Sequence, residues 1–199
     1  LYVSQSTSIV GFFGTLKGID STADADAVSV HDFGVASGSV TGIHTVGGIA
    51  GQMKRVQNRA NVAVERCWNN ASVKGTGTDD RETMAGGIAG YVNGSIVDCY
   101  NTGSISAAAP SAGGIAGSTT SVSGYTRVAN CYNVGTVTGP SQFGAINGWH
   151  HNTSSPTTNC YYLKDSAPSG FGSFKDGTTG GEAKELTDAQ MKSWNAAYW

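Results

Sequence analysis

The stretch GGIAGYVNGSIVDCYNTGSIS, residues 86–106, decides the fold, because both of its halves recur along the chain. The first half, GGIAG, occurs at 47–51, 86–90 and 113–117, with the variants GAING at 144–148 and VGFFG at 10–14. The second half is a cysteine followed by an aromatic residue and usually an asparagine, and it begins at Cys67, Cys99, Cys131 and Cys160. Two motifs that alternate in a fixed order indicate a structural repeat rather than one functional loop.

The second motif extends the repeat to five units. In the first unit, Gly34 stands where the cysteine would be, and Val40 aligns with the β-branched residues of later units. The shortest unit is the 27 residues between the second and third GGIAG. A unit of this size with three short strands cannot bury its own apolar face, so the units are expected to stack on one another.

We therefore expect an all-β, right-handed parallel β-helix of about five coils, with a short helical cap at the C-terminus. The handedness follows from the preference of parallel crossover connections. Residues at one repeat position then form ladders, in which asparagine amides can hydrogen-bond from rung to rung. The pentapeptide glycines are expected to allow positive φ or close backbone approach at each corner. The predicted ladder residues are Cys67, Cys99, Cys131, Cys160, Asn69, Asn101 and Asn133.

The composition fits this architecture and excludes several classes of protein. Charged residues make up only 13% of the chain, about half the usual share. A net charge of -2 gives no electrostatic case for binding nucleic acid or an anionic membrane. No apolar run is long enough to span a bilayer. The printed sequence shows no signal peptide, and Leu1-Tyr2-Val3 reads like the inside of a strand, so we expect a mature or trimmed piece of a longer protein.

The repeated glycines and cysteines do not form the motifs of nucleotide, zinc or redox sites. A phosphate-binding loop needs a single glycine-rich turn followed by Lys-Ser/Thr or an acidic partner, whereas this pentapeptide recurs with neither. The cysteines are 32, 32 and 29 residues apart, which does not match a C-x-x-C site. Disulfides between rungs are the alternative, but parallel Cβ vectors disfavour them. We therefore expect buried free thiols, no metal and no cofactor.

Paired carboxylates would indicate an enzyme that cleaves polysaccharides, because such β-helices place acid and base on adjacent rungs. Here Asp98 aligns with Arg66, Asn130 and Asn159 in an outward column, so that column holds one carboxylate and no pair. The aromatic residue after each cysteine is interpreted as part of a packed ladder. The chain is therefore predicted not to be an enzyme.

The quoted stretch and residues 113–139, GGIAGSTTSVSGYTRVANCYNVGTVTG, resemble the GLUG motif, and the resemblance covers about residues 9–163. That repeat occurs in large bacterial surface proteins, including some IgA-cleaving metallopeptidases and adhesin-like proteins. The resemblance implies an extracellular or cell-surface β-solenoid of bacterial origin. It does not imply peptidase activity, because the HExxH motif of those peptidases is absent.

Functional residues are expected where the repeats differ. The candidate binding residues are Trp149 and His150 after the fourth pentapeptide, Tyr125, and the pair Asp79 and Asp80 in an insertion at 74–85. The loop that follows the fourth pentapeptide is expected to be exposed. A metal site there would need a third ligand, and no spacing supports one.

The chain is predicted to divide into a repeat region, 1–163, and a linker and capping segment, 164–199. Thr187-Asp188-Ala189-Gln190 fits a capping box that opens a short helix, and 183–199 is expected to dock over the C-terminal end. We expect a monomeric, non-catalytic surface module, adhesin-like or a spacer, that presents loops to a host or matrix protein or a glycan, without nucleic acid or membrane insertion. The alternative is a carbohydrate-binding or carbohydrate-cleaving β-helix, with Tyr161 and Tyr162 as further candidates for stacking on sugar rings.

Overall fold

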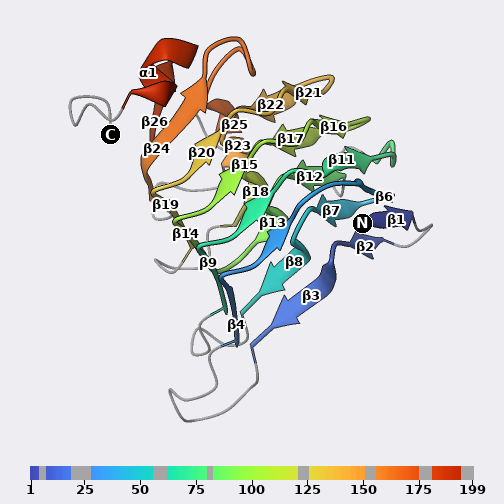
Figure 1. The fold of residues 1–199 in the computed structure, drawn as a ribbon. Helices are drawn as coiled ribbons and strands as arrows, with labels where there is room; N and C mark the ends of the chain where they lie inside the picture. The colour runs from blue at the N-terminus through green and yellow to red at the C-terminus, as the bar shows by residue number, and fades with distance from the viewer. Residues whose placement is uncertain are drawn as a thin grey trace.

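The chain winds into stacked coils whose strands pair in parallel with their equivalents one coil away (Figure 1). The computed structural model describes residues 1–4, 8–18, 28–55, 62–79, 83–120, 126–150, 156–174 and 181–193. All strand pairings within these ranges are parallel, and a short helix follows the last strand. The prediction of an all-β parallel β-helix with a C-terminal helix is confirmed.

Each full coil contains five short strands, or four where two have merged, rather than the three expected. The first coil comprises β1 (Tyr2–Ser4), β2 (Ile9–Val10), β3 (Phe13–Lys17), β4 (Val28–His31) and β5 (Gly34–Val35). The second comprises β6 (Ser39–Gly42), β7 (Thr45–Gly47), β8 (Ala50–Lys54), β9 (Val62–Glu65) and β10 (Trp68–Asn69). The third comprises β11 (Ser72–Gly75), β12 (Met84–Gly86), β13 (Ala89–Val92), β14 (Ser95–Val97) and β15 (Tyr100–Asn101). The fourth comprises β16 (Ile105–Ala107), β17 (Ser111–Gly113), β18 (Ala116–Thr119), β19 (Arg127–Ala129) and β20 (Tyr132–Asn133). The fifth comprises β21 (Val137–Thr138), β22 (Gln142–Gly144), β23 (Asn147–His150) and β24 (Thr157–Leu163).

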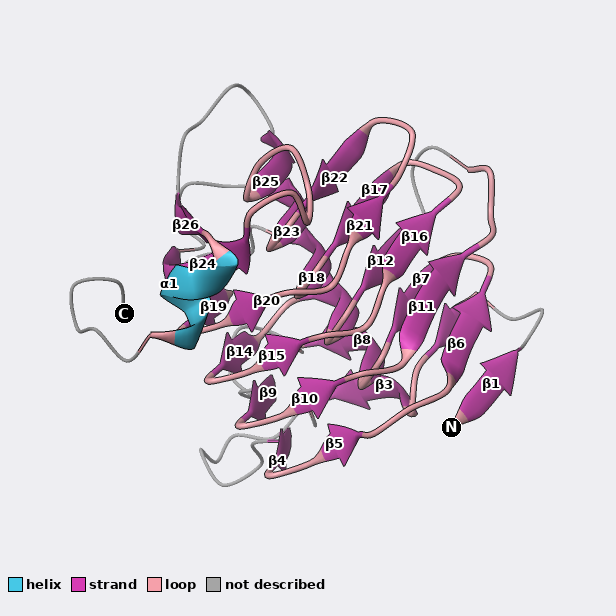
Figure 2. Ribbon diagram, turned by 45° about the horizontal axis from the view of Figure 1, so that its top comes forward, coloured by secondary structure: helices cyan, strands magenta, loops and turns pink. Residues whose placement is uncertain are grey.

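The coils build four sheets that enclose one core (Figure 2). The first sheet has the order β1-β6-β11-β16-β21, and the second has β2-β7-β12-β17-β22. The third runs β3-β8-β13-β18-β23 and continues into β25 (Phe171–Phe174). The fourth contains two parallel paths, β4-β9-β14-β19 and β5-β10-β15-β20, which both end on the long strand β24.

The register corrects one alignment made from the sequence. Gly34 pairs with Trp68, so Phe33, and not Gly34, stands at the cysteine position of the first coil. The first coil therefore has one more residue than later coils before Val40, which pairs with Val73. Gly38 lies in this short connection with φ +119°, a conformation that is open to glycine and costly for other residues. An alignment without a gap cannot show this extra residue.

The polar residue before each cysteine has a backbone reason. Asp32, Arg66, Asp98, Asn130 and Asn159 have φ between 50° and 55°. This left-handed conformation is several-fold enriched in Asn and Asp. These residues therefore turn the chain between the two paths of the fourth sheet, rather than only alternating along a strand as the sequence pattern predicts.

The pentapeptide glycines provide space rather than positive φ. A Cβ atom on Gly87 would lie 2.1 Å from the Gly114 carbonyl oxygen and 2.5 Å from Cγ of Asn101. Gly48 and Gly114 have the same relation to Asn69 and Asn133, with distances to Cγ of 2.5 and 2.3 Å. The glycine of one motif thus makes room for the asparagine of the other, which explains why the two motifs recur together.

The asparagine ladder is buried and hydrogen-bonded from coil to coil. Asn69 Nδ2 donates to Asn101 Oδ1 at 2.8 Å, and Asn101 Nδ2 donates to Asn133 Oδ1 at 2.8 Å. Each amide also donates to the backbone carbonyl two residues further on, at 2.8 Å. Buried polar groups need such partners, because an unpaired one costs about 1–3 kcal/mol. The ladder therefore places amides in an apolar core without that penalty.

The four cysteines lie in the core as free thiols, each at most 1% exposed. Burial raises the pKa of the Cys131 thiol well above its usual range. A buried neutral thiol reacts slowly with disulfide reagents, because the thiolate is the nucleophile. We expect the native chain to be nearly inert to Ellman's reagent and all four thiols to react in guanidinium chloride. Rapid native labelling, or fewer than four thiols after unfolding, would contradict this arrangement.

The C-terminal segment continues the β-helix. β25 pairs with β23, and β26 (Gly181–Leu186) pairs with β24, so the described part of the expected linker adds two strands to the sheets. α1 (Asp188–Lys192) follows at once, and both bonds of the expected capping box at Thr187 are present. Residues 194–199 of the expected cap lie outside the described residues.

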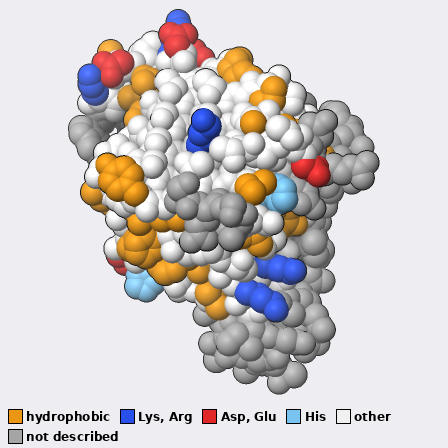
Figure 3. Space-filling model, turned by 90° about the vertical axis from the view of Figure 1, so that its right-hand side faces the viewer, with side chains coloured by type: hydrophobic (Ala, Val, Ile, Leu, Met, Phe, Trp, Pro, Cys, Tyr) orange, Lys and Arg blue, Asp and Glu red, His pale blue; other side chains and the backbone are white. Residues whose placement is uncertain are grey.

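The outer surface carries few charges, in keeping with the composition. Figure 3 shows one side of the molecule, on which a few Lys, Arg, Asp and Glu side chains are scattered among uncharged atoms. Nowhere in the described ranges does a helix have the length and apolar character needed to cross a membrane.

Candidate functional site

Aromatic side chains form a column on the outside of the fourth sheet. In β10, β15 and β20 the asparagine points into the core, so the aromatic residue before it points outward. The rings of Trp68 and Tyr100 are 6.0 Å apart and nearly parallel, and those of Tyr100 and Tyr132 are 4.9 Å apart with 3° between their planes. All three residues are half-buried. The aromatic ladder expected from the sequence is therefore a surface feature.

A polar column runs beside the aromatic one, along the left-handed turns. Asn159 Nδ2 donates to Asn130 Oδ1, and Asn130 Nδ2 donates to Asp98 Oδ1, both at 2.9 Å. The hydroxyl of Tyr161 donates to Asn159 Oδ1 at 2.6 Å. An amide nitrogen carries two hydrogens, and the column uses one from each of these amides. The second remains available to an acceptor outside the column.

The other end of this column contains a second carboxylate, Asp32. Arg66 donates to both of its oxygens, at 2.7 and 2.9 Å. The Arg66 guanidinium, together with His31, holds the pKa of the Asp32 carboxyl well below its usual range. Asp32 and Asp98 are two rungs apart, about 10 Å at the spacing of paired strands. Arg66 occupies the rung between them, where a glycosidase would need its substrate, so this pair does not form a glycosidase site.

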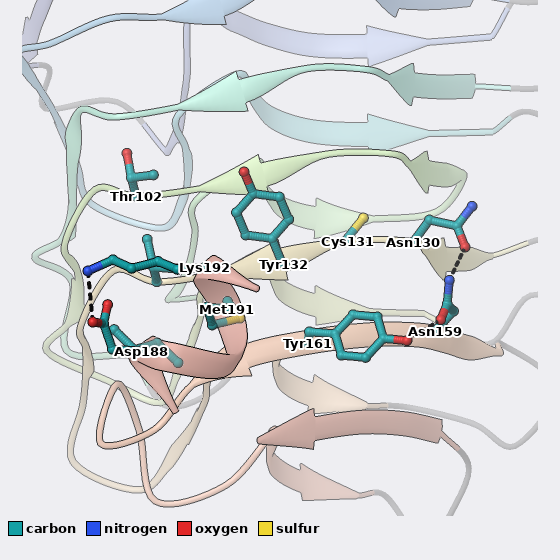
Figure 4. Close-up of a pocket in the computed structure, with 11 residues that line it drawn as sticks. Thr102, Asn130, Cys131, Tyr132, Asn159, Tyr161, Asp188, Met191 and Lys192 are labelled. Atoms are coloured by element: carbon teal, nitrogen blue, oxygen red, sulfur yellow. Dashed lines mark hydrogen bonds and ion pairs between the residues drawn. The ribbon is translucent and has the colours of Figure 1, made fainter. Parts of the chain in front are cut away.

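A hollow of about 710 Å³ lies where both columns meet α1, and we call it the tyrosine groove (Figure 4). Leu186, which is 1% exposed, pairs with Leu163 and anchors the strand that leads into the helix. The helix then forms one wall of the groove with Met191. The lining residues are Thr102, Asn130, Cys131, Tyr132, Val134, Asn159, Tyr161, Leu163, Asp188, Met191 and Lys192.

The groove combines aromatic rings, amides and a compensated ion pair. Figure 4 shows Tyr132, Tyr161 and Met191 around the hollow, with the bonded amides of Asn130 and Asn159 to one side. Lys192 Nζ donates to Asp188 Oδ2 at 2.7 Å, so the two charges of the helix wall neutralise each other. The groove therefore suits a neutral ligand that has apolar faces and hydroxyl groups.

The sequence-predicted binding residues are not brought together. Trp149 lies half-buried in β23 of the third sheet, whereas Asp79 is exposed in the connection between β11 and β12. Tyr125 and Asp80 lie outside the described residues. Tyr161, a secondary candidate for sugar stacking, is in the groove, but Tyr162 is 7% exposed and takes the asparagine position of the last coil.

His150 is in the core, and this corrects the expectation of an exposed loop. It is 0% exposed, and its Nδ1 lies 2.9 Å from Oγ1 of Thr119. The rings of Phe171 and Phe174 contact it edge-on, at 5.8 and 5.7 Å. His150 pairs with Thr119 in the strand register, so it continues an inward ladder that is apolar in earlier coils. It cannot serve a surface ligand in this position.

The groove was missed from the sequence because its parts are far apart. Residues of the fourth and fifth coils line it together with Thr102, which follows the third coil, and α1, which lies more than fifty residues after Tyr132. Across the part of the chain that the structure describes, no group of three or more His, Cys, Asp or Glu is arranged to hold a metal ion.

Comparison with known proteins supports the sequence resemblance and the fold. Residues 82–106 match the GLUG motif. A similar solved structure is that of a candidate immunoglobulin A1 protease from Bacteroides ovatus, with a TM-score of 0.63 and 20% sequence identity. The match covers 96% of this chain and 58% of the other, so this chain spans little more than half of that protein. No curated protein matches the sequence. The chain thus contains a GLUG motif and shares the fold of that structure.

Proposed function

We propose that this chain is a non-catalytic module of a bacterial surface protein that binds a neutral glycan in the tyrosine groove. The observation that carries the proposal is the meeting of Tyr132 and Tyr161 with the amides of Asn130 and Asn159 in one hollow. Sugar rings offer apolar faces to aromatic side chains and hydroxyls to amides. A rigid stack of coils keeps both sets of groups at fixed spacing, which lowers the entropic cost of binding.

The surface location and the adhesin-like role are parts of the same proposal. Their support is the GLUG motif at 82–106 and the likeness to a longer protein that is named as a candidate immunoglobulin A1 protease. In such a chain a β-helix would hold the groove at a set distance from other domains. The binding surface proposed here is a groove on the coil face, rather than the loops expected from the sequence.

A glycan array tests the proposal, followed by calorimetry with the strongest neutral glycan. We expect Tyr161→Ala to weaken binding about tenfold or more, since loss of a buried aromatic contact costs over 1 kcal/mol. Trp149→Ala, on another sheet, should leave the affinity unchanged, as should Tyr91→Ala in β13. The Trp149 variant separates the groove from the site expected from the sequence.

A structural spacer is the second candidate function, favoured by the unbroken stacking of five coils. No saturable binding to any glycan would support the spacer and overturn the groove proposal. Release of new reducing ends from a bound glycan would contradict the non-catalytic role. Binding that is lost in Trp149→Ala but kept in Tyr161→Ala would move the site to the third sheet.

A further inference from the structure

The tyrosine groove has hydrogen-bonding groups along its edges and apolar side chains between them. Figure 4 shows the amides of Asn130 and Asn159 to one side of the hollow, and Asp188 and Lys192 on the other. Four further lining residues have no nitrogen or oxygen in their side chains: Cys131, Val134, Leu163 and Met191. Burial of a polar group against such side chains costs free energy unless the group finds a partner. A sugar that carries an apolar substituent in place of a hydroxyl group therefore fits this lining better than a plain hexose.

The amide edge of the groove keeps one donor and one acceptor on each side chain. Asn130 Nδ2 donates to Asp98 Oδ1, and Asn159 Nδ2 donates to Asn130 Oδ1, both at 2.9 Å. The Tyr161 hydroxyl donates to Asn159 Oδ1 at 2.6 Å. A side-chain amide has two N–H hydrogens and two oxygen lone pairs, and these bonds use one of each on both residues. The hydrogen and the lone pair that remain can pair with the carbonyl and the N–H of a second amide.

The backbone does not explain why both of these residues are asparagines. The same left-handed turn is made by Asp32, Arg66 and Asp98 in the earlier coils. A carboxylate or a guanidinium in the groove would favour a charged ligand, whereas an amide is the neutral side chain that this turn accepts most readily. Asparagine at both groove positions therefore indicates a neutral ligand that is recognised through an amide.

An acetamido group on a sugar meets both requirements of the groove. Its N–H donates and its carbonyl accepts, so it can form two hydrogen bonds with one asparagine side chain. Its methyl group adds apolar area, whose burial in the groove is favourable. Lys192 lies 2.7 Å from Asp188 Oδ2, and this ion pair leaves the helix wall without net charge. The wall therefore favours a neutral substituent over a charged one.

We propose that the tyrosine groove binds N-acetylated hexosamines in preference to hexoses that carry only hydroxyl groups. The acetamido group pairs with Asn159, because the bond between the Tyr161 hydroxyl and Asn159 makes the ring and the amide neighbours. A sugar residue that lies against Tyr161 then reaches this amide, and its acetamido methyl group is buried in the apolar lining. The selection rests on the proposed function, since the same groove holds the glycan.

Calorimetry with matched oligosaccharides tests this selection. Trimers of N-acetylglucosamine and of glucose with the same linkage differ only in the acetamido group, and glycosides of N-acetylgalactosamine and galactose form a second pair. We expect the 199-residue chain to bind the N-acetylated member of at least one pair about tenfold more tightly. An array that presents N-acetylhexosamines in homopolymers and at the ends of branched glycoprotein glycans distinguishes these two sources. Binding to either source with the acetamido preference supports the selection.

Two variants of Asn159 assign the preference to its amide. Asn159→Gly removes the amide and keeps the turn, because glycine adopts the φ of 52° found at this position without steric cost. Asn159→Asp keeps the size of the side chain but replaces the N–H donors with a charged acceptor, and it tests the amide even if Asn159→Gly fails to fold. In each variant the preference should fall to less than about threefold. The matched control is Asn70→Asp, which adds the same charge at an exposed position outside the groove lining and should leave the preference unchanged.

The outcomes separate this selection from the proposed function. Equal affinities within both sugar pairs would overturn the selection, while binding of a neutral glycan would still stand. A preference that persists in both Asn159 variants would overturn it as well. If no neutral glycan on the array binds, the proposed function itself fails, and the selection fails with it.

Discussion

Gly87→Ala is expected to destabilise the β-helix by about 3 kcal/mol, at the upper end of the usual cost of overpacking. The added Cβ would lie 2.1 Å from the Gly114 carbonyl oxygen and 2.5 Å from Cγ of Asn101. Neither neighbour can move easily, because one is backbone of the next coil and the other is held in the asparagine ladder. The same substitution would stabilise by about 0.4–1 kcal/mol through the unfolded chain if space were available. The steric cost is larger than this gain, so the net effect of Gly87→Ala on stability is unfavourable.

Thermal unfolding followed by circular dichroism measures this effect. For a chain of this length, about 3 kcal/mol corresponds to a fall in Tm of roughly 6–12 °C. Gly139→Ala is the matched control, because its Cβ would meet Phe143 at an ordinary 3.4 Å, and its Tm should not fall. Equal Tm values for the two variants would show that the pentapeptide glycines are not required for packing.

The spacing of the motifs was enough to predict the architecture, because a β-helix repeats its environment once per coil. A residue that recurs once per coil, such as the cysteine or the asparagine, occupies the equivalent position in each coil, and this can be inferred even when its contacts are unknown. The pairing of Gly87 with Asn101 was not predicted, because the two residues touch across the core. The last coil shows that the glycine and asparagine positions depend on each other. There, Ala145 stands at the glycine position and Tyr162 stands at the asparagine position.

The candidate site was harder to predict, because it depends on where the repeat ends. Trp149-His150-His151 looked like a loop, since a polar run after a glycine motif usually is one. The register instead carries His150 into the core beside Thr119, where hydrogen bonds replace the apolar contacts of earlier coils. The tyrosine groove exists because α1 closes one side of a column that is open on the earlier coils. Neither feature is visible in the spacing of motifs.

Asn101→Ala is expected to cost about 3 kcal/mol, because it creates a cavity and leaves buried polar groups without partners. Asn101 is the central rung, which accepts from Asn69 and donates to Asn133 and to the Gly103 carbonyl, all at 2.8 Å. Removal of the Asn101 side chain leaves the Gly103 carbonyl without this donor and breaks the ladder on both sides. Asn70→Ala is the control, because Asn70 is exposed and its bonds to the Ala36 carbonyl and from the Thr102 hydroxyl lie at the surface. We expect that change to cost less than about 0.5 kcal/mol.

A double-mutant cycle of Asn101→Ala and Asn133→Ala separates the ladder bond from simple loss of volume. Residues joined by a buried hydrogen bond show coupling of about 0.5–3 kcal/mol, so we expect about 1 kcal/mol for this pair. Asn69→Ala and Asn133→Ala alone should each cost about as much as Asn101→Ala, since each end rung replaces one asparagine partner with a backbone N–H, that of Ala71 or of Gly135. Chemical denaturation of the parent chain, the four single variants and the double variant measures all of these free energies. Zero coupling, or equal losses for Asn70→Ala and Asn101→Ala, would mean that the amides recur for backbone geometry alone and that the bonds between coils contribute nothing to stability.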